Sequence, residues 1–515
     1  MRTSPRPGRA ALLVAVTLSL TVACTADADG DPQDAGVPAF AGVPCPAEVS
    51  TLVVSEVTCG YLTVPESRTE QGRTIRLFVT RVPPPEGASE AEPVFVAGTD
   101  LGDVPNISGI APMAQRTGRE VIVLEPRGVG RSEPTLDCRE VQEVAPLTLA
   151  TATDDPSTRQ RYLGAVAACY DRLTQAGIDV SAYGIGEMAA DAEDLRRALG
   201  IESWNVATFG TSSRIALEML RTAPDHLRGV LLDSPEWPGL DPRTAAARST
   251  DEAFAAVFDA CAQDPVCQAA YPVGVDALTA ALTRLETAPV VVTVDDQSGD
   301  GGVEVRFDAA MLLQALRSAL AGDSVGGLYS AEAVPSVVAA VLAGGTEELS
   351  TLAAALVGDD AYCNGYHPRC SSDGRGAGAV DLTILCRDVA PFSSPGAPVV
   401  GAERAGFAAA FSRSPYLDVC SSWPVDPGPA EVGEQVRSDV PVLVMAGAFD
   451  PYVRPGAARA GLRGLSSLTF LVDPAGGHNV MPRTDCMLGV RQAWLDDPTR
   501  VVSADCLQTV RPDWP

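Results

Sequence analysis

The residues of this chain that could move protons follow two apolar runs. Asp450 follows the run from Val440 to Ala446, and His478 follows the run from Leu468 to Val472 in a Gly-Gly-His turn. The sequence contains 3 His in all, so a His in such a turn is a notable feature. An acid that orients an imidazole at a sheet edge supplies two of the three members of a nucleophilic triad. Asp450 and His478 are candidates for such a pair, and the alternative for His478 is a loop residue without a role.

A hydroxyl nucleophile to complete the triad is harder to find. A literal G-x-S-x-G occurs at 322–326 and contains Ser324. It follows an expected helix from Met311 to Leu320, and no strand leads into it. This motif marks a nucleophile only where a strand turns sharply into a helix. We therefore interpret the match at 322–326 as a coincidence.

The segment 121–132 indicates a family. It reads VIVLEPRGVGRS and resembles the D-x-R-G-x-G-x-S turn of the tripeptidyl/prolyl aminopeptidase-like α/β-hydrolases, with Glu125 in place of Asp. Other segments match that family in order and spacing: Asp191, Leu195–Gly200, Trp204-Asn205, Leu231–Asp233, Gly447–Pro451, Gly476–His478, and Cys486 with Cys506. The resemblance covers roughly Cys45 to Trp514. It implies a serine hydrolase that removes residues or short peptides from a free N-terminus, with Asp450 and His478 as acid and base.

The resemblance places a glycine where the nucleophile should stand. The family pattern W-N-x-x-G-x-S-x-G-x-R aligns without gaps to 204–214, which reads WNVATFGTSSR, so that Gly210 takes the place of the serine. The bend at this position is strained for a residue with a Cβ atom, and glycine removes that cost. We expect the bend to be kept and the hydroxyl to be lost. Ser212 is an alternative nucleophile, although Arg214 would then occupy a position that needs a small residue.

The loop that should stabilise the oxyanion has also diverged. The family's H-G-G-P-G corresponds here to 97–101, AGTDL, in which only Gly98 is retained. Gly98 and Thr211 are the positions expected to provide oxyanion donors. Asp100 would place negative charge beside a developing anion, which has the wrong sign for catalysis. Two altered parts of one site are better explained by lost acyl-transfer chemistry than by two accidents.

The remaining pattern predicts the α/β-hydrolase fold, a doubly wound and mostly parallel sheet with an inserted helical lid. Tyr61–Val64 and Ile75–Val82 alternate like half-buried antiparallel strands. Near-continuous apolar runs predict buried parallel strands, with helices between them; they are Val94–Val96, Val121–Leu124, Trp204–Phe209, Val230–Leu232, Val440–Ala446 and Leu468–Val472. The helices are expected at Glu187–Leu199, Ser213–Arg221 and Met487–Leu495. We predict the first part of the core at 45–237, the helical lid at 238–435, and the return to the core, with the family's C-terminal segment, at 436–515.

The N-terminal residues resemble a bacterial export signal. Arg2, Arg6 and Arg9 precede an uncharged apolar run, Ala10–Ala23, which is too short to span a bilayer comfortably. The run ends in a sequence similar to a lipobox, TVAC. We expect a signal peptide at 1–24 with lipidation of Cys24, or else simple cleavage nearby, and a disordered tether at 25–44. The chain is thus expected to be a bacterial cell-surface lipoprotein or an extracellular protein, and no later segment is apolar enough to be a membrane helix.

The cysteine count agrees with export. There are 13 Cys, and assigning Cys24 to lipid leaves an even set. The simplest pairing is consecutive, although sequence alone does not prove connectivity: Cys45 with Cys59, Cys138 with Cys169, Cys261 with Cys267, Cys363 with Cys370, Cys386 with Cys420, and Cys486 with Cys506. The absence of C-x-x-C and the scarcity of His argue against a metal site. No motif for a cofactor occurs.

Charge narrows the set of partners. The chain has 38 basic and 66 acidic residues, a net charge of −28, and every basic residue is Arg. Such an acidic protein is poorly suited to bind nucleic acid or anionic lipid. We expect a monomer that contacts the membrane only through the N-terminal lipid.

Three hypotheses for function remain open. The first is a catalytically silent relative that retains a peptide-sized cleft and binds a peptide or a small acyl or amide ligand. The second is an active serine hydrolase or peptidase that uses Ser212, or a bound water, with His478 and Asp450. The third is a non-catalytic envelope lipoprotein with a binding or structural role, in which the cleft is irrelevant. Fold alone does not choose among them.

Overall fold

The computed structural model describes residues 38–47, 49, 57–70, 72–88, 91–98, 107–152, 154–295, 302–321, 330–358, 378–392 and 418–514. All of these residues belong to one compact unit, Pro38–Pro515. Within these ranges, no helix has both the length and the apolar character needed to cross a membrane. Cys24 and the other residues of the expected export signal, together with the 322–326 motif, lie outside the described residues.

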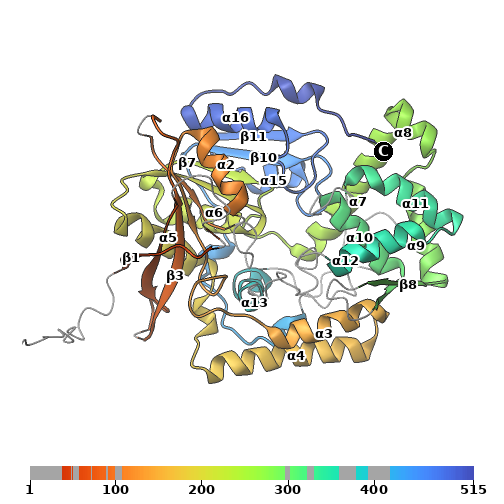
Figure 1. Cartoon of the computed structure of the whole chain (residues 1–515), viewed down its shortest axis with the longest axis horizontal. Coiled ribbons are helices and arrows are strands. Elements are labelled where there is room, and N and C mark those ends of the chain that lie inside the picture. The colour runs from red at the N-terminus through yellow and green to blue at the C-terminus, as the bar shows by residue number, and fades with distance from the viewer. Residues whose placement is uncertain are drawn as a thin grey trace, which may run out of the picture. The chain divides into compact units, whose positions relative to one another are not determined.

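A central sheet carries the fold. Across the described strands its order is β1-β2-β3-β5-β4-β6-β7-β10-β11 (Figure 1). The strands are β1 (Ala39–Val43), β2 (Thr58–Pro65), β3 (Thr74–Val82), β4 (Val94–Val96), β5 (Val121–Leu124), β6 (Trp204–Phe209), β7 (Leu227–Asp233), β10 (Val442–Gly447) and β11 (Leu468–Asp473). The pairings β1–β2, β2–β3 and β3–β5 are antiparallel, and those from β5 through β4, β6, β7 and β10 to β11 are parallel. The predicted fold class and strands are confirmed.

The apolar strands are buried on both faces because successive side chains point to opposite sides of a sheet. In β5, Val121 and Val123 enter one hydrophobic core, whereas Ile122 and Leu124 enter another. The helices α2 (Ile107–Thr117) and α16 (Asp485–Asp496) contribute to the first core. The helices α5 (Ile185–Ala198) and α6 (Ser213–Thr222) contribute to the second. The three helices predicted in the core are confirmed, with ends shifted by at most two residues.

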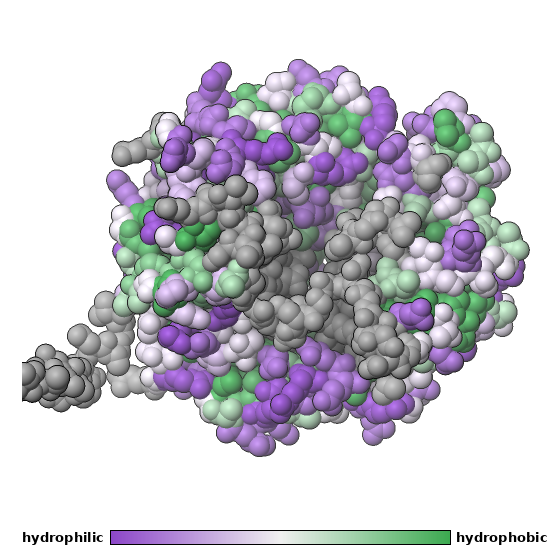
Figure 2. Space-filling model, viewed as in Figure 1, coloured by the Kyte–Doolittle hydropathy of each residue, from purple (hydrophilic) through white to green (hydrophobic). Residues whose placement is uncertain are grey.

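Further helices complete the core layers. They are α3 (Arg139–Ala150), α4 (Pro156–Gln175) and α15 (Pro455–Gly461), with 3-10 turns η1 (Val180–Ala182), η3 (Pro224–His226), η8 (Asp418–Ser421), η9 (Ala430–Gly433) and η10 (Asp505–Thr509). Figure 2 shows hydrophilic side chains along the part of the viewed face where α3 and α4 lie. This surface agrees with a strongly acidic chain that keeps its apolar residues inside.

The inserted lid has its own hydrophobic core. Its elements are α7 (Pro242–Gln263), α8 (Pro265–Ala270), α9 (Val275–Thr287), β8 (Val290–Asp295), β9 (Gly302–Phe307), α10 (Ala309–Ala321), η4 (Ala331–Ala333), α11 (Val334–Ala343) and α12 (Glu347–Gly358). Their buried side chains form one cluster, separate from the two cores on the sheet. The lid is helical as predicted, but it also contains the antiparallel hairpin β8–β9, which the sequence analysis did not anticipate.

The predicted lid boundary at 435 is too late. The segments α13 (Gly378–Ile384), η6 (Leu385–Val389, a π-helix) and η7 (Ala390–Phe392) return to the sheet. Val380, Leu385 and Trp423 all belong to the core cluster that contains α5 and α6. Figure 1 accordingly shows α13 apart from the helices α7 to α12. The Ala-rich composition of the segment concealed this division, because a helix buried in either core has the same apolar pattern.

The predicted tether also ends earlier than expected. Residues 39–43, assigned to a disordered tether at 25–44, form β1 and pair with β2 in register from Ala39 with Thr63 to Val43 with Cys59. The short run AFAGV carries no strong strand signal of its own, and the edge of β2 supplies its hydrogen-bond partners.

Five of the predicted disulfides lie among the described residues, with the consecutive pairing confirmed. They are Cys45–Cys59, Cys138–Cys169, Cys261–Cys267, Cys386–Cys420 and Cys486–Cys506. Each joins residues that are at most 34 positions apart, so each ties a local segment to its neighbour. The bond between Cys386 and Cys420 belongs to the segment that returns to the core, not to the lid.

The remaining predicted pair is not among these bonds. Cys363 and Cys370 were expected to form a disulfide with each other, because they are close in sequence. Both Cys363 and Cys370 lie outside the described residues. The disulfide between Cys363 and Cys370 therefore stays a prediction.

Candidate active site

Asp450 and His478 lie in hydrogen-bond contact beyond the carboxyl ends of β10 and β11. The Nδ1 atom of His478 is 2.9 Å from Oδ2 of Asp450. The other oxygen, Oδ1, accepts the N–H groups of Tyr452 (2.8 Å) and Val453 (2.9 Å). Both side chains are buried. The carboxylate is therefore held in one orientation and favours the tautomer in which Nδ1 of the imidazole carries the proton.

The bend predicted at Gly210 joins β6 to α6. After Phe209 the chain enters the 3-10 turn η2 (Gly210–Ser212) and continues directly into α6. Gly210 has a φ of 54°, in the left-handed region that other L-residues avoid. The ring of Phe209 lies 4.8 Å from that of His478, centroid to centroid, so the bend is beside the imidazole. The turn thus keeps the backbone of a nucleophile elbow, and its apex residue has no side chain.

Ser212 is used to close this turn. Its hydroxyl donates to the carbonyl of Phe209 at 2.7 Å and lies 3.4 Å from the carbonyl of Gly98. The same oxygen accepts the N–H of Phe209 at 3.1 Å. The side chain has no exposed surface. These contacts bind the elbow to the loop after β4, and they do not favour Ser212 as a replacement nucleophile, because an attack would break them.

The predicted oxyanion positions flank the elbow. Gly98 follows β4 with a φ of 95°, and its carbonyl faces the Ser212 hydroxyl. Thr211 lies within η2, immediately after the apex. Asp100 and its neighbours Thr99 and Leu101 lie outside the described residues. The role of Gly98 and Thr211 as oxyanion donors therefore stays a prediction.

The loop that follows β11 and carries His478, residues 474–481, is called the histidine loop. The lid contacts this loop through the end of α10. The N–H of His478 donates to the carbonyl of Ala321, the last residue of that helix, at 2.8 Å. A Cβ atom on Gly477 would lie 2.2 Å from the carbonyl oxygen of Leu320, so the close approach requires glycine. Arg317 of the same helix stacks on the ring of Tyr452 at 4.1 Å, and this ring meets the imidazole edge-on. The Gly-Gly-His pattern thus serves packing against the lid as well as a turn.

A second buried carboxyl lies behind the histidine loop. Asp233, at the end of β7, accepts the N–H groups of Val480 (3.1 Å) and Met481 (2.8 Å). Burial raises the pKa of Asp233 to about 7, although these two hydrogen bonds and the charge of His478 act in the opposite direction. Sequence reasoning identified Leu231–Asp233 as part of the family resemblance but assigned no role to the carboxyl. An acidic residue that ends an apolar strand is the signal that could have found it.

The segment that first indicated the family is a structural element. Arg127 is completely buried and makes a bidentate pair with Asp191, with both distances 2.7 Å. Glu125, in place of the family's Asp, accepts hydrogen bonds from the backbone and side chain of Arg131. Paired and hydrogen-bonded charges of this kind are stable when buried. They connect β5 to α5 and do not form part of the acid–base site.

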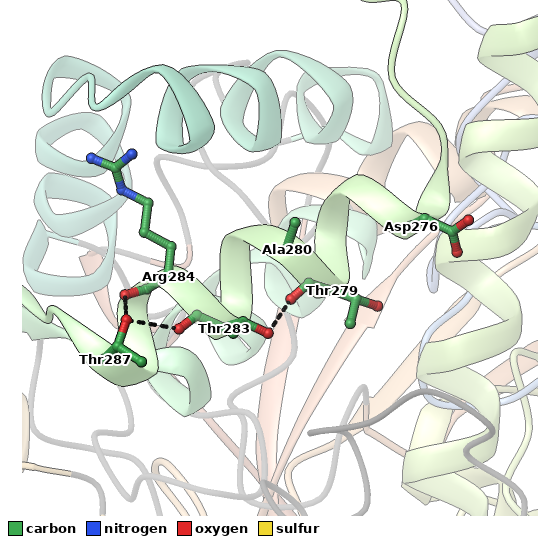
Figure 3. A pocket seen from close by; sticks show the side chains of 6 residues that line it. All are labelled: Asp276, Thr279, Ala280, Thr283, Arg284 and Thr287. Carbon is green, nitrogen blue, oxygen red and sulfur yellow. Dashed lines mark hydrogen bonds between the residues drawn. The ribbon is translucent and has the colours of Figure 1, made fainter.

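A separate groove follows the outer face of α9. Figure 3 shows its lining, all from this helix: Asp276, Thr279, Ala280, Thr283, Arg284 and Thr287. The hydroxyls of Thr283 and Thr287 donate to carbonyls of their own helix, as the dashed lines show. The groove is a solvated helix face and does not include His478. Across the described ranges, no cluster of His, Cys, Asp and Glu could hold a metal ion.

Comparison with known proteins agrees with this geometry. Residues 100–264 match the model of the alpha/beta hydrolase fold, and residues 405–505 match that of the TAP-like proteins. The sheet and the elbow define an α/β hydrolase. With the C-terminal match, the chain belongs to the TAP-like family of α/β hydrolases.

Individual relatives are distant. The chain is 25% identical over 189 residues to "Putative hydrolase YuaR" of Escherichia coli (strain K12), a match that covers 35% of this chain and 36% of that protein. The chain thus matches about a third of the length of this curated relative. Among solved structures, the proline iminopeptidase of Mycobacterium smegmatis has 16% identity and a TM-score of 0.37, over 85% of this chain and 98% of that chain. The esterase of Thermogutta terrifontis has 14% identity and a TM-score of 0.33, over 84% and 97%.

Proposed function

We propose that this chain is an exported TAP-like α/β hydrolase that has lost acyl transfer and acts by binding a peptide or a small acyl or amide ligand beside His478. The observation that carries the proposal is Gly210, at the apex of an intact elbow next to an intact acid–base pair. Acyl transfer needs a side-chain oxygen at this apex to form the covalent intermediate. Glycine provides no side-chain oxygen at the apex for the imidazole to deprotonate.

The surviving groups suit recognition. The imidazole of His478 is oriented by Asp450, and the rings of Phe209 and Tyr452 lie 4.8 and 4.7 Å from it. An oriented imidazole between aromatic rings can exchange a hydrogen bond with a carbonyl or amide while the rings cover the apolar part of a ligand. The resemblance to aminopeptidase-like hydrolases supports a peptide or a related acyl or amide compound as the ligand class.

A fluorophosphonate probe, which labels activated serines, tests whether catalysis is lost. We expect the wild-type chain to remain unlabelled. Labelling that disappears in Ser212→Ala would overturn the proposal and establish Ser212 as the nucleophile. Labelling that disappears in Ser324→Ala would overturn it in favour of the 322–326 motif. A known serine hydrolase labelled in the same tube provides the positive control.

Thermal shift separates a binding protein from a structural one. A ligand that binds only the folded state at 100 times its dissociation constant adds about 2.7 kcal/mol to the unfolding free energy. We expect short peptides with a free N-terminus, or small acyl amides, to raise the melting temperature of the wild type but not of His478→Ala. Equal shifts in the two proteins would overturn a site at His478, because the ligand would then bind elsewhere, and no shift in either across both compound classes would favour the purely structural alternative.

The proposal of export rests on the N-terminal pattern and on the disulfides. Five disulfides among the described residues suit an oxidising compartment. If Cys24 is the lipidated N-terminus, the mature chain will incorporate an alkyne-tagged fatty acid in a bacterial host, and Cys24→Ser will not. A wild-type chain that is secreted without the label would support simple cleavage nearby.

A further inference from the structure

The turn that follows β7 contacts both halves of the candidate site. We call Asp233–Glu236 the β7 turn. Its first two residues bond to the histidine loop, and its last residue bonds to the elbow. In the sheet, Asp233 is also the register partner of Phe209, the last residue of β6 before the elbow. One short segment therefore lies between the two parts whose relative position decides what His478 can reach.

Asp233 holds the loop just after His478. Its two carboxylate oxygens take one N–H each, from Val480 and Met481. The side chain is buried, and the Ser234 hydroxyl lies 3.3 Å from Oδ1. Burying a carboxyl group costs free energy unless hydrogen-bond donors surround it. The N–H groups of Val480 and Met481 are such donors, and the carboxyl group in turn fixes these two successive amides of the loop.

Ser234 holds His478 itself. Its hydroxyl lies 3.0 Å from the carbonyl oxygen of His478, and its N–H donates to the carbonyl of Met445 in β10 at 2.8 Å. Ser234 has a φ of 48° and is the one non-glycine with positive φ across the described ranges. Left-handed backbone at a residue with a Cβ atom persists where the surroundings enforce it, often at functional sites. The serine side chain gives a contact to His478 that an unstrained glycine would not provide.

The end of the turn holds the elbow. The N–H of Glu236 donates to the carbonyl of Gly210 at 3.3 Å. Its carboxylate accepts the Nε–H of Arg214, in the first turn of α6, at 3.0 Å. The β7 turn is thus bonded to the apex of the elbow, to the helix after it and to the histidine loop.

We propose that Asp233 and Ser234 are positioning residues that set the orientation of His478 relative to the elbow. This inference deepens the proposed function and rests on it, since it assumes that His478 faces the ligand. The β7 turn holds the loop in place although Gly210 offers no hydroxyl.

The tautomer of His478 tests the proposal directly. Long-range proton–nitrogen correlations from the carbon-bound imidazole protons report which ring nitrogen is protonated. The chain has only 3 His, and His478→Gln assigns the signal. We expect one tautomer, protonated on Nδ1, in the wild type, and a mixture in Ser234→Ala and in Asp233→Asn. We also expect hydrogen exchange at the Val480 and Met481 amides to rise at least tenfold in Asp233→Asn.

Ser132→Ala is the matched control. Ser132 is equally buried, and its hydroxyl accepts the N–H of Phe78 (3.0 Å) and donates to the carbonyl of Glu125 (2.7 Å), away from the histidine loop. It should leave the His478 signal unchanged even if it lowers the melting temperature as much as Ser234→Ala does.

A wild-type tautomer in Ser234→Ala would overturn the proposal, and this variant decides alone if Asp233→Asn does not fold. The measurement needs neither turnover nor ligand. Probe labelling of the wild type would refute the proposed function and leave this result standing, whereas an unchanged tautomer would refute only the positioning role.

Discussion

Replacing Gly210 with serine would return an oxygen to the apex of the elbow, and the structure sets both the cost and the gain. The backbone there has a φ of 54°. A residue with a Cβ atom in this region costs about 1–2 kcal/mol. Unfolding entropy is about 2 cal/mol/K per residue, or roughly 1 kcal/mol/K for a unit of this size. The melting temperature of Gly210→Ser should therefore fall by about 1–2 °C, and the protein should stay folded.

The gain in activity can be bounded in the same way. An intact triad is worth a factor of about 10⁶ in turnover, and each missing oxyanion donor costs about 10²–10³. With Asp450 and His478 in contact but the loop at 97–101 diverged, about 10³ of the triad's contribution should remain. We expect Gly210→Ser to hydrolyse p-nitrophenyl acetate or an aminoacyl p-nitroanilide about 10³-fold faster than Gly210→Ala, and to become labelled by a fluorophosphonate.

Gly210→Ala is the appropriate reference because it carries the same backbone strain without the hydroxyl. The double variant with His478→Ala should return to the level of that reference, since the serine would then have no base. If Gly210→Ser and Gly210→Ala have equal turnover and equal labelling, although both melt within a few degrees of the wild type, the elbow is not opposite the imidazole and the reasoning is wrong.

Three further predictions concern stability. Burial raises the pKa of Asp233 to about 7, so the folded state retains a proton that the unfolded chain releases near pH 4. The free energy of unfolding should therefore fall between about pH 4 and pH 7, by up to about 1.4 kcal/mol per pH unit from this group. Urea denaturation of Asp233→Asn at several pH values should lack this pH-dependent contribution. A methyl group on Gly477 would lie 2.5 Å from the carbonyl of Ala321, so Gly477→Ala should loosen the lid at the histidine loop and speed proteolysis of the lid, whereas alanine at the open position Gly489 should not. Replacing Cys486 and Cys506 by serines removes a disulfide that links residues 20 positions apart, and should lower the free energy of unfolding by about 3 kcal/mol. An unchanged midpoint in denaturant titration would contradict the presence of this bond.

Much of the fold could be predicted because its signals are local. The apolar runs of the parallel strands are visible residue by residue, and the parallel strands of the sheet overlap those runs. The cysteine pairs that the structure describes are close in sequence and needed no knowledge of the fold. The lid boundary and β1 were predicted wrongly for one reason. Contacts with other segments of the chain place α13 and the run AFAGV in the core, and such contacts produce no periodic pattern in the sequence of the segment itself.

The candidate site divides in the same way. Asp450 and His478 were predicted from the match to the family's acid and histidine turns, which follow two of the predicted strands. The β7 turn was missed, because Ser234 meets the carbonyl of His478 across 244 positions. The hydroxyl of Ser212 could have faced the imidazole or the backbone, and only the folded elbow turned it towards Phe209 and Gly98.

The amino-acid sequence by itself determined which atoms are available at the elbow: residue 210 has no side chain, and no arrangement of the fold can supply an oxygen from it. It also determined the strands, since alternation and apolar runs are properties of the chain alone. Tertiary structure decided which groups meet, including the contact of α10 with the histidine loop and the links from the β7 turn to His478 and Gly210. Hydrogen bonds act over about 3 Å, and only the folded chain brings residues so distant in sequence within that range.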